Sequence, residues 1–157
     1  MSTTQIPPEW RTHAESTDYR ETPSYSDTVA FARRLAHASP SIEYQYFGFS
    51  GEGRELPLVI ASETHTFTPE AAKSQGKAVV LIQACIHSGE PDGKDAGFAL
   101  LRDVAITQTA AGILNNVVLL FIPIYNTDGT SAPVRTIAST RTAQPTWAGA
   151  RPARIKI

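Results

Sequence analysis

Short, dense apolar runs alternate with amphipathic stretches along this chain, and that alternation predicts an α/β fold. The densest run is Ala78–Cys85, in which seven of eight residues are apolar. A run this short and this apolar predicts a strand buried on both faces. A second run, Asn116–Tyr125, is apolar throughout its middle, and we expect the same environment for it.

The amphipathic stretches predict four helical segments. In the first, Ser24 or Ser26 supplies the N-cap and Pro40 ends the helix. In the others, apolar residues recur at helical spacing or proline occupies the first helical position. The predicted segments are Asp27–Ala38, a short helix starting at Pro69, a helix from Asp92 or Gly93 to Ile106, and a short helical turn over Thr107–Leu114.

A β-hairpin is predicted between the first helix and the first dense run. Ile42–Phe49 and Leu56–Ala61 have the pattern of strands, and Ser50–Gly53 has the composition of the turn that joins them. The expected architecture is therefore a mixed, mainly parallel sheet with helices on both faces.

Composition places the chain among ordinary globular proteins, with 157 residues, 41% hydrophobic and 18% charged. This length predicts one domain with a core of moderate size. The single cysteine, Cys85, lies inside the first dense run, so we expect a packed thiol and no disulfide within the chain. No apolar run reaches the roughly 18 residues of a membrane span. The N-terminal residues show no signal peptide, and the localisation stays open.

Charge is distributed unevenly although the net charge is only −1. Residues 130–157 carry five basic side chains and no acidic one, a balance of +5. The first 129 residues carry the other 14 − 5 = 9 basic and all 15 acidic side chains, a balance of −6. The basic segment also lacks apolar periodicity, which sets it apart from the rest of the chain.

The strongest candidate for chemistry is the turn after Ala78–Cys85. His87 and Glu90 follow the strand at its C-terminal end, where open α/β sheets bind ligands. An imidazole and a carboxylate on one sharp turn can converge on a metal, and both are zinc ligands at about 2.0–2.2 Å. A third ligand has to come from elsewhere; His65 lies in loop-like sequence without a ligand-spaced partner and is the first candidate only if zinc binds tightly. A solvated histidine on a surface turn gives the same H-x-x-E motif, so the motif alone does not decide.

Several further motifs follow this turn in a characteristic order along the chain. HSGE leads into DGKDA at a helix start, and NVVLLFIPIYNTDG follows. This arrangement resembles the N-terminal half of the zinc metallocarboxypeptidases, the carboxypeptidase A-like family, and most closely a bacterial branch with a GEGR hairpin. The resemblance runs from Tyr25 to Gly129. The family's Asn-Pro-Asp-Gly turn stands here as residues 126–129, with Thr127 in place of proline.

The resemblance implies an α/β carboxypeptidase-like fold, Zn²⁺ held by His87 and Glu90, and peptide or protein C-termini as substrates. In the family, the third zinc ligand (a histidine), the general base (a glutamate) and the arginines that bind substrate lie beyond the position of Gly129. None of them is present in frame here, and no histidine follows His87. We therefore expect no catalytic residue in this chain and interpret it as a truncated, inactive fragment.

Three segments are predicted. Residues 1–24 form an N-terminal arm, with Trp10 and Tyr19 as anchors; residues 25–129 form the N-terminal half of the enzyme domain; residues 130–157 form a basic tail. The tail is either genuine, able to touch an acidic surface or nucleic acid, or translated out of frame. One permitted set of codons for Arg135–Ala150, read in another frame, encodes YNRINQNGPAHLGWR. That peptide resembles the family segment after the Asp-Gly turn, which favours a frameshift near residues 130–135 and no nucleic-acid partner.

Two other function classes stay open. A zinc-dependent amino-acid deacylase would use the same His-x-x-Glu pair on a similar sheet, and a downstream carboxylate clamp would discriminate the two hydrolases. A non-catalytic fragment would need neither, and zinc titration would separate it from a chain with a residual metal site. We also expect the fragment to leave an unpaired strand edge and an uncovered apolar face.

Overall fold

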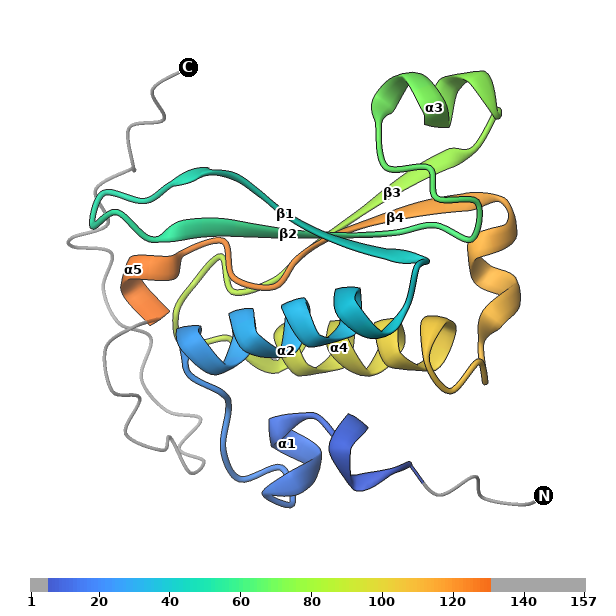
Figure 1. Ribbon diagram of the computed structural model, residues 1–157. Helices are drawn as coiled ribbons and strands as arrows, with labels where there is room; N and C mark the ends of the chain where they lie inside the picture. Colours follow the sequence, from blue (N-terminus) through green and yellow to red (C-terminus); the bar gives the residue numbers. More distant parts are fainter. Residues whose placement is uncertain (1–5, 131–157) are drawn as a thin grey trace.

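The computed structural model describes residues 6–130 of the chain (Figure 1). Its elements are η1 (Pro8–Trp10), α1 (His13–Ser16), α2 (Tyr25–Ala38), β1 (Ile42–Phe49), β2 (Glu55–Ala61), α3 (Pro69–Ser74), β3 (Ala78–Gln83), α4 (Asp92–Ala105), η2 (Ala111–Asn115), β4 (Val117–Ile122) and α5 (Thr127–Thr130). The predicted helices and strands are present except that the helical turn expected over Thr107–Leu114 is a 3-10 helix over Ala111–Asn115. The strand expected over Asn116–Tyr125 is shorter, because Pro123 has no N–H to donate to the sheet.

The four strands form one mixed sheet in the order β1-β2-β4-β3. β1 pairs with β2 and β2 with β4 in antiparallel fashion, whereas β3 and β4 are parallel. The α/β class and the mixed sheet are confirmed. Among the described strands, however, two of the three pairings are antiparallel, so the expectation of a mainly parallel sheet is wrong there. The short turn between β1 and β2 accounts for one of these pairings, because it permits only a hairpin.

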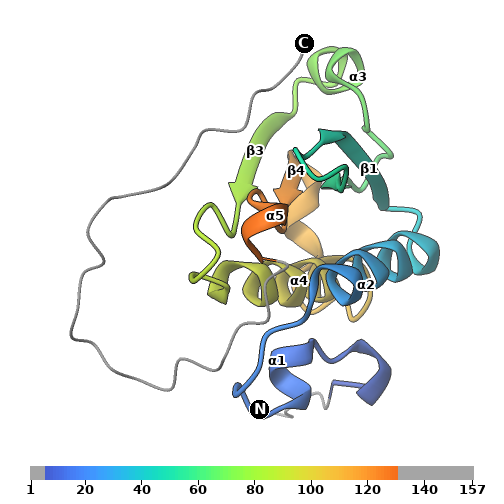
Figure 2. The ribbon, with the colours of Figure 1, turned by 90° about the vertical axis from the view of Figure 1, so that its left-hand side faces the viewer.

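The main core lies between the sheet and the helices α2 and α4, which run side by side across one face (Figures 1 and 2). The Phe98 ring of α4 meets Phe121 of β4 edge to face, with centroids 5.4 Å apart. Gly97 permits this approach, because a Cβ atom there would lie 2.2 Å from the Phe121 ring. Helix α4 is therefore seated directly on β4.

The opposite face of the sheet is covered only in part. Helix α3 packs there through Ala72 against Ile60 of β2 and Val118 of β4. It lies at one end of the sheet, away from the hairpin turn (Figure 1). Helices thus cover both faces, as predicted, but the second face has only one short helix among the described residues.

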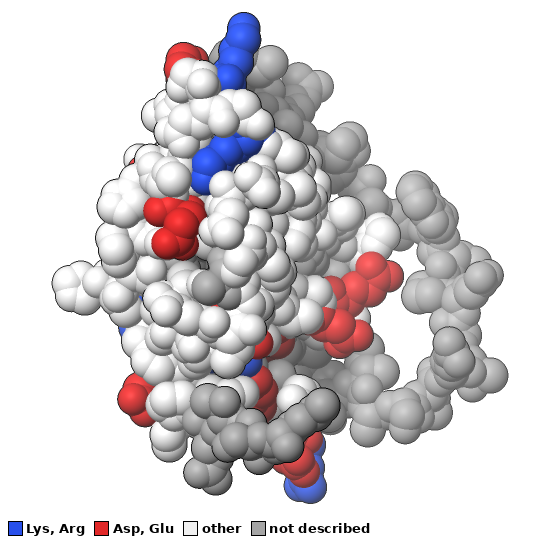
Figure 3. All heavy atoms as spheres, turned by 90° about the vertical axis from the view of Figure 1, so that its right-hand side faces the viewer, with Lys and Arg blue, Asp and Glu red and all other residues white. Residues whose placement is uncertain are grey.

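The prediction that both dense runs are buried is right for β4 and wrong for β3. Val118, Leu119 and Phe121 of β4 are each at most 4% exposed. Val79 and Leu81 on one face of β3 are 53% and 54% exposed. The physical reason is the place of β3 in the sheet: within residues 6–130 it is one of the two edge strands and pairs on one side only, whereas β4 is a central strand. The surface seen from the right of Figure 1 is mostly uncharged (Figure 3).

The N-terminal arm, residues 6–24, lies against α4 and α2 (Figure 2). Trp10 anchors the arm, as expected, because its side chain packs against the main core. The Arg34 guanidinium also lies 5.4 Å from the centroid of the Trp10 ring, in a cation–π contact. Tyr19 was expected to anchor the arm too, but its side chain is 76% exposed. Its left-handed backbone, with a φ of 58°, places it at a tight turn. No helix within residues 6–130 is long and apolar enough to cross a bilayer.

Candidate metal centre

The exits of β3 and β4 are joined at one edge of the sheet. Tyr125 N–H donates to Ala84 O at 3.0 Å, and Asn126 N–H donates to Cys85 O at 3.0 Å. Cys85 has a left-handed φ of 50°, which redirects the chain from the strand into the turn. Its side chain is buried, as predicted, and burial raises the pKa of the thiol. The residues after β3 and after β4 therefore lie close together.

The structure brings His87 and Glu90 into contact. His87 Nδ1 and Glu90 Oε2 are 3.1 Å apart, and Glu90 N–H donates to His87 O at 3.1 Å to close the turn. Both side chains are largely exposed, at 71% and 73%. The two side chains thus converge at the carboxyl end of β3, as predicted, and solvent and ligands can reach them.

The donor atoms of this pair fit a tetrahedral metal ion. Two ligands about 2.0–2.1 Å from zinc with tetrahedral angles lie roughly 3.3 Å from each other, close to the separation found. Within residues 6–130, no group of three or more His, Cys, Asp or Glu side chains is gathered as a metal site. His65 does not complete it, because its ring stacks on Phe67 near α3, with centroids 6.0 Å apart. The pair supplies two ligands.

The turn after β4 has a role that the sequence reasoning missed. Asp128 accepts hydrogen bonds from Ser50 Oγ at 2.7 Å and Arg54 Nη1 at 2.8 Å, and from the backbone N–H of Glu52 at 3.2 Å. Desolvation alone would raise the pKa of Asp128, but these hydrogen bonds outweigh it and lower the pKa below its usual value of 3.8. The β1–β2 hairpin is thereby tied to the β4 exit.

Lys94 is the second group that the sequence reasoning missed. Its side chain is fully buried, and Nζ donates to Pro23 O at 2.6 Å. Burial lowers the pKa of this ammonium group. A signal was present, because position 94 shares a helical stripe with the buried residues Phe98 and Leu101, four and seven positions later. A lysine on that stripe has to be buried with its charge.

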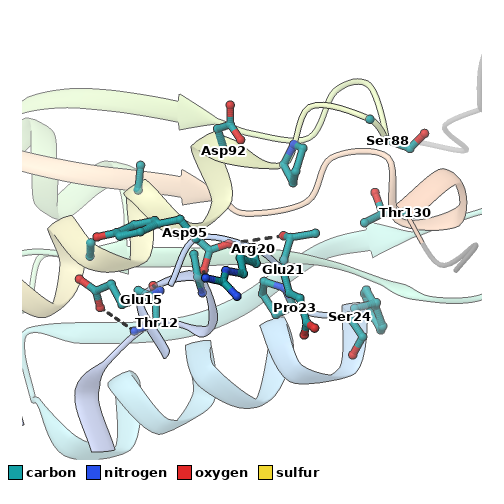
Figure 4. A pocket seen from close by; sticks show the side chains of 18 of the residues that line it. Thr12, Glu15, Arg20, Glu21, Pro23, Ser24, Ser88, Asp92, Asp95 and Thr130 are labelled. Atoms are coloured by element: carbon teal, nitrogen blue, oxygen red, sulfur yellow. Dashed lines mark hydrogen bonds between the residues drawn. The ribbon is translucent and has the colours of Figure 1, made fainter. Parts of the chain in front are cut away.

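A cavity of about 1140 Å³ is lined by the arm, by the start of α4 and by Ser88 and Gly89 of the turn between His87 and Glu90. Figure 4 shows Ser88, Asp92 and Asp95 on the side of the turn and α4, with the arm residues Glu15 and Glu21 across from them. The arm therefore forms one wall of the space beside the candidate metal pair.

The structure thus combines an α/β sheet with a His–Glu pair at the carboxyl end of a parallel strand, the place where open α/β sheets bind ligands. The chain belongs to the zinc carboxypeptidase family, whose model matches residues 28–150. The matched range begins after the arm and continues past Gly129, into residues outside those described. No curated protein matches the chain.

Solved carboxypeptidases share the fold. Carboxypeptidase A from Helicoverpa armigera is 26% identical with a TM-score of 0.60, over 69% of this chain and 25% of that one. A metallo-carboxypeptidase from Burkholderia cenocepacia is 25% identical with a TM-score of 0.55, over 69% and 28%. Bovine thrombin-activatable fibrinolysis inhibitor, solved with a tick carboxypeptidase inhibitor, is 18% identical with a TM-score of 0.58, over 73% and 34%. The chain spans between a quarter and about a third of these proteins.

Proposed function

We propose that this chain is the N-terminal part of a zinc-dependent carboxypeptidase, an enzyme that removes C-terminal residues from peptides. The observation that carries the proposal is the His87–Glu90 pair, 3.1 Å apart and accessible at the carboxyl end of β3, in a chain of the zinc carboxypeptidase family. A bound zinc ion supplies Lewis-acid chemistry, polarising a carbonyl and lowering the pKa of its water.

Two residues of the chain would hold the metal. His87 offers its imidazole and Glu90 its carboxylate, and the hydrogen bond from Glu90 N–H to His87 O keeps both on one turn. The turn that carries these two metal ligands is held to the end of β4, because Cys85 O accepts a hydrogen bond from Asn126 N–H. A rigid turn lowers the cost of ordering the ligands when the metal binds.

We further propose that the chain alone binds zinc weakly and has no peptidase activity. Two protein ligands leave most of the coordination to water, whereas catalytic sites use three. Calorimetry with zinc should show binding much weaker than that of a complete site, and His87→Ala should abolish it. Tight one-to-one binding that depends on His87 would contradict the proposal by revealing a third ligand.

Activity assays test the second half of this proposal. The purified 157-residue chain should release no C-terminal residues from model peptides with zinc present. Hydrolysis that is lost in Glu90→Ala would show instead that the chain is a complete enzyme. Glu70→Ala is a suitable control, because Glu70 is an exposed residue on α3, distant in sequence from the pair.

The frameshift hypothesis for residues 130–135 remains a proposal that the DNA of the locus decides. The family match continues to residue 150 in the existing frame, which bears against a frameshift near residues 130–135. A second frame that continues for hundreds of bases and encodes a further histidine and glutamate would support it. A stop codon within a few triplets of that frame would refute it.

A further inference from the structure

Helix α4, which begins directly after the candidate metal pair, lacks a local cap. Its N-cap residue Pro91 makes no side-chain hydrogen bond to the first turn. By contrast, Ser24 caps α2 and Thr68 caps α3, each by accepting a backbone N–H of the helix. One backbone bond constrains this helix start locally, from Lys94 N–H to Pro91 O at 3.0 Å, and beyond it the orientation of the first turn depends on tertiary contacts.

The N-terminal arm supplies those contacts. Lys94 Nζ, fully buried, donates to Pro23 O at 2.6 Å. The neighbouring Asp95 carboxylate accepts Ala14 N–H at 3.1 Å and the Thr22 hydroxyl at 3.4 Å. Lys94 and Asp95 belong to the first turn of α4, four and five residues beyond Glu90. The arm therefore forms hydrogen bonds with the start of the helix close to the candidate metal pair.

The arm is itself fixed farther along the same helix. Arg102, 2% exposed, donates to Glu15 at 2.6 Å. Glu15 also belongs to a capping box with Thr12, which orders α1. The contact at Arg102 lies eight residues beyond Lys94, roughly 12 Å along the helix axis. The arm is therefore held to α4 at two separate places, and only the contacts at Lys94 and Asp95 act on the first turn of the helix.

We propose that Lys94 is a positioning residue, which sets the geometry of the His87–Glu90 pair by fixing the first turn of α4 to the Pro23 carbonyl of the arm. This inference rests on the proposed metal role of the pair. Only Pro91 separates Glu90 from the helix, so a shift of the first turn moves the Glu90 carboxylate relative to His87. Of the two partners in this contact, Pro23 precedes the range matched by the family model and Lys94 lies within it.

The experiment is a zinc titration of the full chain, in which binding is monitored through the NMR signals of the four histidine rings. In the wild type, His87 should shift while His13, His37 and His65 stay largely unchanged. Lys94→Met keeps the aliphatic volume and removes the hydrogen bond, and we expect it to weaken zinc binding at His87 about tenfold. Amide hydrogen exchange should rise at Glu90, whose N–H bonds to His87 O, with the β2–β4 amides unaffected.

Arg102→Met is the matched control, because it loosens the same arm far from the metal pair and should leave zinc affinity unchanged. Asp95→Ala removes two arm contacts at the first turn without creating a buried charge. It should weaken zinc binding in the same direction, and it carries the test if Lys94→Met does not fold. Equal zinc affinity in the wild type and Asp95→Ala, or equal losses at Lys94 and Arg102, would overturn the positioning role. A wild-type chain whose His87 does not respond to zinc would instead overturn the metal pair itself.

Discussion

Strands β3 and β4 have almost the same apolar sequence pattern and opposite environments. They are parallel neighbours in register, so that Val79 of β3 lies opposite Val118 of β4. The side chain of Val79 is 53% exposed and that of Val118 is 3% exposed. The difference comes from sheet order, because β4 lies between β2 and β3, while β3 pairs on one side only among the described strands. Apolar density identifies a strand but does not identify its neighbours.

The largest expected effect comes from placing a charge at these two register partners. Val118→Asp buries an unpaired carboxylate between the sheet and α3, and it should cost about 4 kcal/mol or more of unfolding free energy. Val79→Asp leaves its carboxylate in water and should stay within about 1 kcal/mol of the wild type. Urea denaturation measures both. Equal losses at the two valines would show that β3 is covered in solution, by a second copy or another segment.

Two glycines of α4 extend the comparison of β3 and β4 to the contacts that each makes with this helix. A Cβ atom at Gly97 would lie 2.2 Å from the Phe121 ring of β4, so Gly97→Ala should cost about 1–3 kcal/mol through overpacking. At Gly93 the nearest atom is the Ala84 Cβ just after β3, 3.2 Å away. Gly93→Ala should fall within about 1 kcal/mol of the wild type, because the gain in helix propensity offsets a small adjustment. Thermal unfolding of both variants provides the test, and a neutral Gly97→Ala would contradict the close seating of α4 on β4.

The smallest expected effect concerns the exit of β4. The pKa of Asp128 is lowered in the folded state, so its ionised form stabilises the fold. That contribution is present above the ordinary carboxyl pKa of about 3.9 and is lost as the pH falls through the lower folded value. Stability measured from pH 6 to pH 2 should therefore decline less steeply in Asp128→Asn than in the wild type. Identical pH profiles would mean that the Ser50 and Arg54 contacts do not persist in solution.

Local patterns predicted the elements and the position of the candidate pair. The caps, the strand bounds and the turn that carries His87 and Glu90 all depend on residues within a few positions of each other. The features that the sequence did not reveal depend on contacts between residues far apart in the sequence. Lys94 meets Pro23 across 71 positions and Asp128 meets Ser50 across 78, and no single-sequence pattern specifies such pairs. The exposure of β3 belongs to the same class, since it follows from which strand lies beside it.

The strand order has a consequence for biosynthesis. The β1–β2 hairpin is complete as soon as Ala61 has been made. Among the strands of residues 6–130, however, β3 has no partner that is synthesised before it, because its neighbour β4 comes later. Between Gln83 and Val117 the ribosome must add residues 84–116, which are 33 residues. At roughly 5–20 residues per second, this interval lasts roughly 2–7 s. For a period of the same length, after β3 has left the ribosome and before β4 has, the nascent chain presents an unpaired Ala-Val-Val-Leu-Ile-Gln segment, an apolar sequence of high β-propensity that favours aggregation.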